Sequence, residues 1–196
     1  MLHEKLKNYH VILASQSPRR QMLMKGLGLE FEILPADVEE NYPSKLRHKE
    51  IAIYLSELKA NTFELSKLCD NCLIITADTI VWKDDQILLK PKDDQDAKQI
   101  LRNLSGEMHE VITGVTLRTK QKMKTFHVIT RVYFNSLTED EIDYYVSNYH
   151  PFDKAGAYGA QDWIGFVGIE RIEGCYFNVV GLPVQQLWKE LNDFLN

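Results

Sequence analysis

The apolar residues of the chain fall into continuous runs, which are typical of strands buried on both faces, and spaced runs, which are typical of helices. The first two continuous runs, Tyr9–Ala14 and Cys72–Ala77, predict buried strands, the second ending at Asp78 and Thr79. Further strands are expected at Phe31–Leu34, Glu110–Leu117 and Phe126–Phe134, and a hairpin at Ile80–Trp82 and Ile87–Leu89 around Lys83–Gln86. Lys90 and Pro91 close that hairpin.

Helix signals separate these strands. Ser17 and Pro18 have the composition of an N-cap and first helical position, and Gly26 and Gly28 end the helix. The spacing of Ile51, Tyr54, Leu55, Leu58, Thr62 and Leu65 predicts a long helix over Leu46–Leu68. Others are expected from about Asp94 to Leu104, from a capping box that begins at Thr138, and from Val184 to Leu195. Strands alternating with helices indicate an α/β or α+β fold around a mixed sheet, without internal repeats.

Composition narrows the class of protein. Apolar residues make up 44% of the 196 and charged residues 26%, which excludes disorder and fits one domain or two closely packed lobes. The net charge of -5 and the lack of a basic stripe argue against a nucleic-acid partner. Three cysteines are too few for a disulfide framework, so we expect a reducing compartment. The Cys69-x-x-Cys72 spacing precedes a strand rather than opening a helix, and no second pair completes a zinc site, so we attribute it to chance. We find no signal peptide or membrane span, and therefore expect a cytoplasmic protein.

The first predicted helix carries a candidate anion site. Ser15, Ser17, Arg19 and Arg20 surround its N-terminus, where free backbone amides and the helix dipole favour a phosphate. The alternative is a surface helix whose arginines are merely solvated. No P-loop sequence and no Gly-x-Gly-x-x-Gly after the first strand is present, so the phosphate site would be of another kind.

Acidic residues supply a candidate metal site. Asp78, placed at the end of a predicted strand, and Glu40, in a loop of turn composition with Glu39, offer the hard oxygen ligands that Mg²⁺ prefers beside phosphates. The alternative is that Asp78 caps a turn and the glutamates are solvated. Lys59 and Lys90 are ambiguous in isolation, because most lysines face water.

Other chemistry finds less support. The histidines form no His-Glu-x-x-His pair and no Gly-x-Ser-x-Gly elbow occurs, so histidine-based metal sites and serine hydrolases lack their local signatures. Six of the ten glycines lie between Gly156 and Gly181. We therefore expect 153–183 to be a region of tight turns that belongs to a site more than to the core.

Several sequence blocks are distinctive when they are taken together. They are LASQSPRR ending at Arg20, ADTIV beginning at Ala77, Lys90-Pro91, LSGEMH ending at His109 with Thr113-Gly-Val115, and DKAGAYG ending at Gly159 with Gln161. Together they resemble the Maf family of nucleoside triphosphate pyrophosphatases. Their order and spacing match the family over about 11–183, which is nearly the whole chain.

The resemblance implies a single domain over 1–196, with an α/β fold like that of inosine triphosphate pyrophosphatases. That fold has an elongated mixed sheet, flanking helices and two lobes around a central cleft. It also implies hydrolysis of a nucleoside triphosphate to the monophosphate and pyrophosphate, a divalent cation (Mg²⁺ or Mn²⁺), and a homodimer. On the family pattern Asp78 matches the catalytic acid, Glu40 a second acid that binds metal with Asp78, and Arg20, Lys59 and Lys90 phosphate-binding positions.

The family divides by nucleobase. The branch that acts on dTTP and UTP has Arg, Thr and Gln at the positions of Arg19, Thr79 and Gln161, and all three are present here. A 7-methyl-GTP branch, the first alternative, usually has an aromatic residue in place of Arg19. The second alternative is a nucleotide-binding inhibitor of septum formation without essential catalysis, because the family name is tied to arrest of cell division. The chain departs from the dTTP/UTP pattern at Asp162, where that branch usually has Gly.

Overall fold

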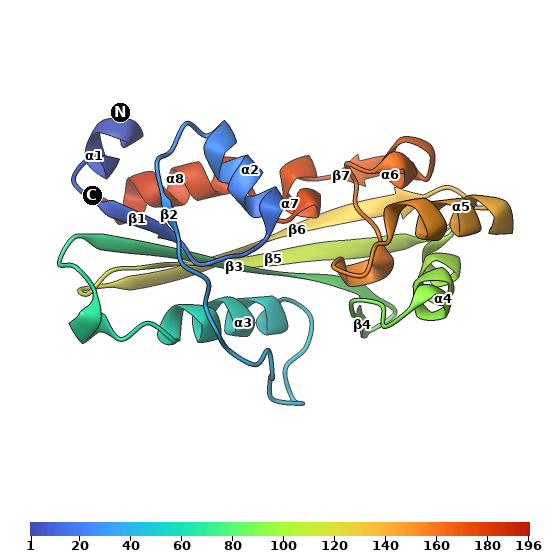
Figure 1. The fold of residues 1–196 in the computed structure, drawn as a ribbon, viewed down its shortest axis with the longest axis horizontal. Helices are drawn as coiled ribbons and strands as arrows, with labels where there is room; N and C mark the ends of the chain where they lie inside the picture. The colour runs from blue at the N-terminus through green and yellow to red at the C-terminus, as the bar shows by residue number, and fades with distance from the viewer.

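The computed structural model describes residues 1–196, except that the side chain of Leu65 lies outside the description. A seven-stranded mixed sheet runs the length of the molecule (Figure 1). Its strands are β1 (His10–Leu13), β2 (Glu32–Ile33), β3 (Cys72–Lys83), β4 (Gln86–Leu88), β5 (Met108–Arg118), β6 (Met123–Phe134) and β7 (Ile169–Glu173). The order is β2-β1-β3-β5-β6-β7, and β4 pairs with β3. The β2-β1-β3 pairs are parallel and the others antiparallel, so the predicted mixed sheet is confirmed.

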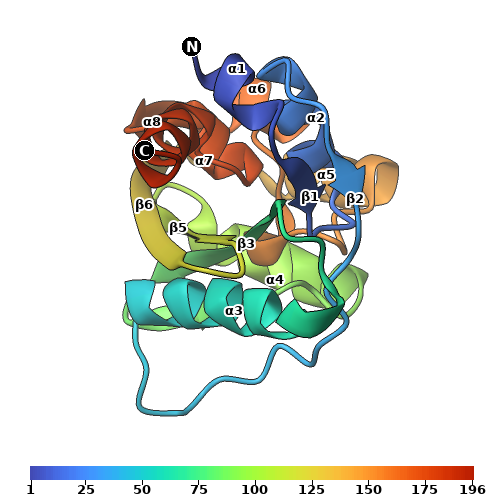
Figure 2. The same ribbon diagram turned by 90° about the vertical axis from the view of Figure 1, so that its left-hand side faces the viewer.

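Helices cover both faces of the sheet. In Figure 1, α3 lies below the long strands, α1, α2 and α8 lie above them, and α4 and α5 gather at the opposite end from the termini. Figure 2 shows α3 alone beneath the sheet at the near end. The helices are α1 (Leu2–Leu6), α2 (Pro18–Gly26), α3 (Lys49–Asn61), α4 (Asp94–Leu104), α5 (Glu139–Tyr149), α6 (Trp163–Val167), α7 (Tyr176–Val180) and α8 (Val184–Phe194), with short 3₁₀ turns η1 (Leu65–Lys67) and η2 (Ala155–Ala157).

The predicted helix ends are largely confirmed. The Ser17 side chain caps α2 and Pro18 is its first residue. Thr138 and Glu141 form both bonds of the capping box that begins α5. Asp84 and Asp85, both with positive φ, form the two-residue turn of the β3-β4 hairpin, as a tight turn between twisted strands requires.

Two predicted boundaries are wrong. The helix expected over Leu46–Leu68 is shorter, since α3 covers only Lys49–Asn61, and the periodic position of Leu65 lies outside the described side chains. The strand expected to end at Asp78 continues to Lys83 without interruption. β5 pairs with it from Ile74 to Trp82, and this ladder carries the strand through its polar residues.

Buried apolar residues form separate clusters toward the two ends of the sheet. One joins α1, α2 and α8 to the sheet and the other joins α4, α5 and α6 to it, and β3 and β5 contribute to both. Tyr158, Ile164, Val180 and Leu182 belong to these clusters, so the glycine-dense region is core as well as site, contrary to expectation. Of the helices described here, none is long and apolar enough to cross a membrane.

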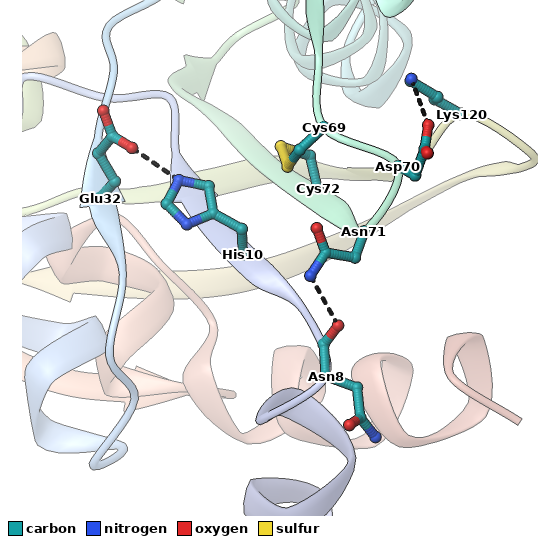
Figure 3. The surroundings of a disulfide bond; sticks show 8 residues. All are labelled: Asn8, His10, Glu32, Cys69, Asp70, Asn71, Cys72 and Lys120. Carbon is teal, nitrogen blue, oxygen red and sulfur yellow. Dashed lines mark hydrogen bonds and ion pairs between the residues drawn. A yellow bond between two sulfur atoms is a disulfide. The ribbon is translucent and has the colours of Figure 1, made fainter.

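The attribution of the Cys69-x-x-Cys72 spacing to chance is wrong, because the two cysteines form a disulfide (Figure 3). Cys69 is exposed in the loop before β3, and Cys72 is the buried first residue of that strand. Around the disulfide, Asp70 pairs with Lys120, and the Asn71 side chain donates to the carbonyl of Asn8. The loop is therefore tied to the β5-β6 turn and to the start of β1.

Candidate functional site

One cavity of about 350 Å³ collects most of the residues singled out in the sequence. Its volume lies within the range of small-molecule sites, about 300 to 1,000 Å³. The lining comes from the start of α2, the loop before α3, the last turn of α3, the middle of β3, the segment after β4, and the region 153–181. The predicted residues among the lining are Ser17, Arg19, Arg20, Glu40, Lys59, Asp78, Thr79, Lys90 and Gln161.

Asp78 and Glu40 meet at the ammonium group of Lys59. Lys59 Nζ lies 2.5 Å from Asp78 Oδ1 and 2.8 Å from Glu40 Oε1. Asp78 is almost fully buried in the middle of β3, whereas half of the Glu40 side chain is exposed. Burial raises the pKa of Glu40, but the hydrogen bond and charge of Lys59, with the charges of Lys90 and Arg20, outweigh it and hold this pKa below its ordinary value. Glu40 is therefore a carboxylate at neutral pH.

At the start of α2, the side chain of Arg20 points into the protein. Its Nε donates to the carbonyl of Gly181 at 2.9 Å and its Nη2 to Thr79 Oγ1 at 3.0 Å. Burial lowers the pKa of Arg20, while Asp78 and Glu40 raise it. A solvated Arg20, the alternative interpretation of this helix, is thus wrong. Ser15 lies behind the cavity wall, where its hydroxyl accepts a bond from Arg20 Nη1 at 3.4 Å.

Arg19 and Gln161 lie at the part of the cavity formed by the region after α5. Arg19 Nη1 is 2.7 Å from Asp153 Oδ2, and Lys154 Nζ is 2.8 Å from the other oxygen of the same carboxylate. Lys154 Nζ is also 3.6 Å from Asp162, which accepts a bond from Gln161 Nε2 at 3.1 Å. A chain of polar contacts therefore connects Arg19 with Gln161.

Sequence reasoning assigned no role to Asp153 or Lys154, although both line the cavity. Their only signal was membership of the block that ends at Gly159. Tyr158 also lines the cavity, and its hydroxyl lies 2.7 Å from His109 Nε2. Burial lowers the pKa of His109 to about 3, so the ring is neutral and acts as a buried partner of Tyr158.

The cavity is electropositive on an acidic protein. Five cationic side chains and three carboxylates line it, against a net charge of -5 for the whole chain. The cations are Arg19, Arg20, Lys59, Lys90 and Lys154, and the acids are Glu40, Asp78 and Asp153. Such a local excess of positive charge, next to the N-terminus of α2, favours a ligand with several negative charges.

The acids fit a divalent cation only in part. Asp78 and Glu40 offer hard oxygen donors close to each other, since both contact Lys59 Nζ. Mg²⁺ binds to such a pair when phosphate oxygens and water complete its coordination shell. In the part of the chain that the structure describes, no group of three or more His, Cys, Asp or Glu is placed to hold a metal ion. A cation here would take its remaining ligands from the bound substrate.

Fold and site together define an α/β protein with an electropositive cavity. The fold is similar to that of the Ham1 protein of Staphylococcus aureus, with a TM-score of 0.50 over 95% of this chain and 100% of that chain, at 15% identity. This likeness confirms the expected fold class.

A family model described as Maf-like protein matches residues 10–194, and the chain belongs to this family. A protein of Bacteroides fragilis is 52% identical over 188 residues, 95% of this chain and 96% of its own length. A protein of Flavobacterium johnsoniae is 49% identical over 191 residues, 97% of this chain and 98% of its own. Both relatives are named dTTP/UTP pyrophosphatase. The resemblance inferred from the sequence blocks is thereby confirmed.

Proposed function

We propose that this protein is a nucleoside triphosphate pyrophosphatase that prefers dTTP, UTP and related pyrimidine nucleotides. The observation that carries the proposal is the meeting of Asp78, Glu40 and Lys59 in an electropositive cavity that also holds Arg19, Thr79 and Gln161. The names of the relatives support the reaction and the base preference.

The cationic residues would bind the triphosphate. Arg20, Lys59 and Lys90 neutralise its charge, and Ser17 offers its hydroxyl at the start of α2. Ser15 contributes through Arg20, which it helps to hold. Arg19, Thr79 and Gln161 face the nucleoside, and the cavity orients both parts against Asp78.

The reaction is an attack of water on the α-phosphorus. A bond forms between the water oxygen and the α-phosphorus, the anhydride bond between the α and β phosphates breaks, and pyrophosphate leaves. Asp78 accepts the proton of the water, and Lys59 holds its carboxylate in place through Oδ1. Glu40 and Asp78 would hold Mg²⁺ or Mn²⁺ with the phosphate oxygens, and the cation supplies further neutralisation of phosphate charge.

The test is pyrophosphate release from dTTP, UTP, CTP, GTP and 7-methyl-GTP with Mg²⁺ or Mn²⁺. We expect turnover of dTTP and UTP above the others, and a loss of about 10³-fold or more in Asp78→Asn, because the proton acceptor is removed. Asp193→Asn, an exposed acid on α8, is the matched control. Turnover confined to guanine nucleotides would favour the 7-methyl-GTP alternative.

Further parts of the proposal concern the whole chain. We place it as a single domain acting as a cytoplasmic homodimer, without a nucleic-acid or membrane partner. A link to cell division has its own test, in which wild type and Asp78→Asn are overproduced in cells. If both arrest septum formation equally while only the wild type hydrolyses nucleotide, a binding role in division replaces the catalytic one.

A further inference from the structure

Asp162 lies next to the base-facing Gln161, directly before α6. An aspartate at this N-cap position ordinarily accepts hydrogen bonds from the first amides of the helix. Among the described contacts of α6, the Asp162 side chain accepts no such hydrogen bond. Its carboxylate is used for tertiary contacts instead, and these contacts determine how Gln161 is presented to a ligand.

Both oxygens of Asp162 are occupied. Tyr145 Oη donates to Oδ2 at 2.9 Å, and Gln161 Nε2 donates to Oδ1 at 3.1 Å. The Tyr145 hydroxyl is itself held, because it accepts the backbone N–H of Gly159 at 3.1 Å. Burial raises the pKa of Tyr145, and Asp162 raises it further, so the hydroxyl keeps its proton and remains a donor. The carboxylate is thus fixed from the side of α5.

The packing around this pair leaves little room for another arrangement. A Cβ at Gly159 would lie 2.6 Å from Asp162 Oδ2 and 2.6 Å from Gln161 Nε2. Only a glycine at this position allows the two side chains to lie against the backbone as they do. Gly159, Gln161 and Asp162 therefore form one packed unit in the cavity wall.

A carboxylate can only accept hydrogen bonds, so it selects one orientation of the Gln161 carboxamide. The nitrogen faces Asp162, and Oε1 remains buried without a hydrogen-bond partner among the described atoms. The opposite orientation would set the amide oxygen against a carboxylate oxygen, and both are acceptors.

We infer that Asp162 is a positioning residue that sets base selectivity by holding the Gln161 carboxamide with its Nε2 group as the donor toward the base. This inference rests on the proposed function. In this orientation the second hydrogen of Nε2, which has no partner among the described contacts, matches a carbonyl oxygen of uracil or thymine. Cytosine has an amino group in place of one of these carbonyls, and would match only the carboxamide turned by 180°.

The experiment compares kcat/KM for UTP and CTP in wild type, Asp162→Asn and Asp162→Gly. Asparagine is nearly isosteric and can donate to Gln161 Oε1, which permits the turned carboxamide. We expect the UTP to CTP ratio to fall by about tenfold or more in Asp162→Asn, mainly through a lower KM for CTP, since a wrongly paired base loses a full hydrogen-bond match. An unchanged ratio in both variants would overturn the inference.

A double-mutant cycle with Gln161→Ala separates positioning from a general effect on the fold. The double variant Gln161→Ala/Asp162→Asn should have the same ratio of kcat/KM for UTP to that for CTP as Gln161→Ala alone. If Asp162→Asn lowers the ratio in the Gln161→Ala background as much as in the wild type, Asp162 acts by another route and the inference is wrong. Asp193→Asn is again the matched control, and thermal unfolding of each variant reports its folding.

Failure of the proposed function would be seen separately, as no pyrophosphate release by the wild type from any triphosphate. In that case calorimetric titration with UMP and CMP tests the inference without turnover. Tighter binding of UMP by the wild type, lost in Asp162→Asn, would support it. Equal binding of the two nucleotides by the wild type would contradict it.

Discussion

At the scale of single residues, Lys59 joins the two acids at the centre of the proposed site. Its side chain is largely buried, and one ammonium group contacts both Asp78 and Glu40. Without this cation, Glu40 would face a second acid in a partly buried cavity, where a like charge raises its pKa. Lys59 thus has two tasks in our proposal, binding of phosphate and retention of Glu40 as a carboxylate.

The second task predicts a change in pH dependence in Lys59→Gln. Lys59 is the chief group that lowers the pKa of Glu40 against the effect of burial, so its removal raises that pKa. If activity requires ionised Glu40, the acidic limb of kcat/KM moves to higher pH, and activity at neutral pH falls about 100-fold. Lys59→Arg keeps the charge and should retain the wild-type acidic limb. An identical limb in Lys59→Gln would show that Glu40 does not control it.

At the scale of elements, the site depends on the close approach of α3 to the sheet. Gly114 of β5 is the cross-strand partner of Asp78, and a Cβ on Gly114 would lie 2.3 Å from the carbonyl oxygen of Ala52 in α3. The helix therefore packs directly on the backbone of β5 beside Asp78. Because of this contact, Lys59 in the last turn of α3 reaches Asp78.

Gly114→Ala should accordingly damage both stability and activity. The methyl group meets backbone atoms that cannot turn aside, so α3 must move, at a cost of about 2 to 3 kcal/mol. We expect the melting temperature to fall by roughly 4 to 12 °C and turnover by about tenfold, because Lys59 moves with its helix. Gly26→Ala, with open space around the added atom at the end of α2, is the control and should be neutral within about 1 kcal/mol. Equal stability of the two variants would contradict the packing argument.

Elements were predictable where a local signal determines them. Ser17, Pro18 and the Thr138 capping box mark helix starts within a few residues, and the structure confirms them. Asp78 shows where such local signals fail, because the polar pair Asp78 and Thr79 after an apolar run resembles the end of a strand. The strand continues through Asp78 because β5 lies alongside, and the pairing with a strand that begins 30 residues later has no local signature.

At the scale of the whole molecule, the cavity is assembled from segments that are distant in sequence. Arg20 and Gly181 are joined by a hydrogen bond across 161 residues, and Arg19 and Asp153 by an ion pair across 134. Sequence reasoning found the candidate phosphate ligands by chemical type, and the family resemblance supplied their grouping. Sequence patterns did not single out Asp153, because its partner Arg19 lies 134 residues away, or Lys154, whose ammonium group contacts Asp153 and Asp162.

The disulfide is also a feature of the molecule as a whole, because it ties the loop before β3 without touching the site. Cys72 precedes Asp78 by six residues on one strand, so the two lie about 20 Å apart. A bond that closes a loop of only four residues stabilises by about 2 kcal/mol through chain entropy. Reduction should therefore lower the melting temperature by roughly 4 to 8 °C and leave pyrophosphate release within about twofold of the oxidised protein.

The measurement is thermal unfolding and turnover with and without a phosphine reductant, beside a thiol titration in denaturant. One free thiol, that of Cys175, is expected before reduction and three after it. Cys69→Ser should melt at the temperature of the reduced wild type and respond no further to reductant, because the same cross-link is already missing. A large loss of activity on reduction would instead mean that the loop before β3 is coupled through the sheet to Asp78. In that case the disulfide would affect the chemistry of the cavity as well as the stability of the fold.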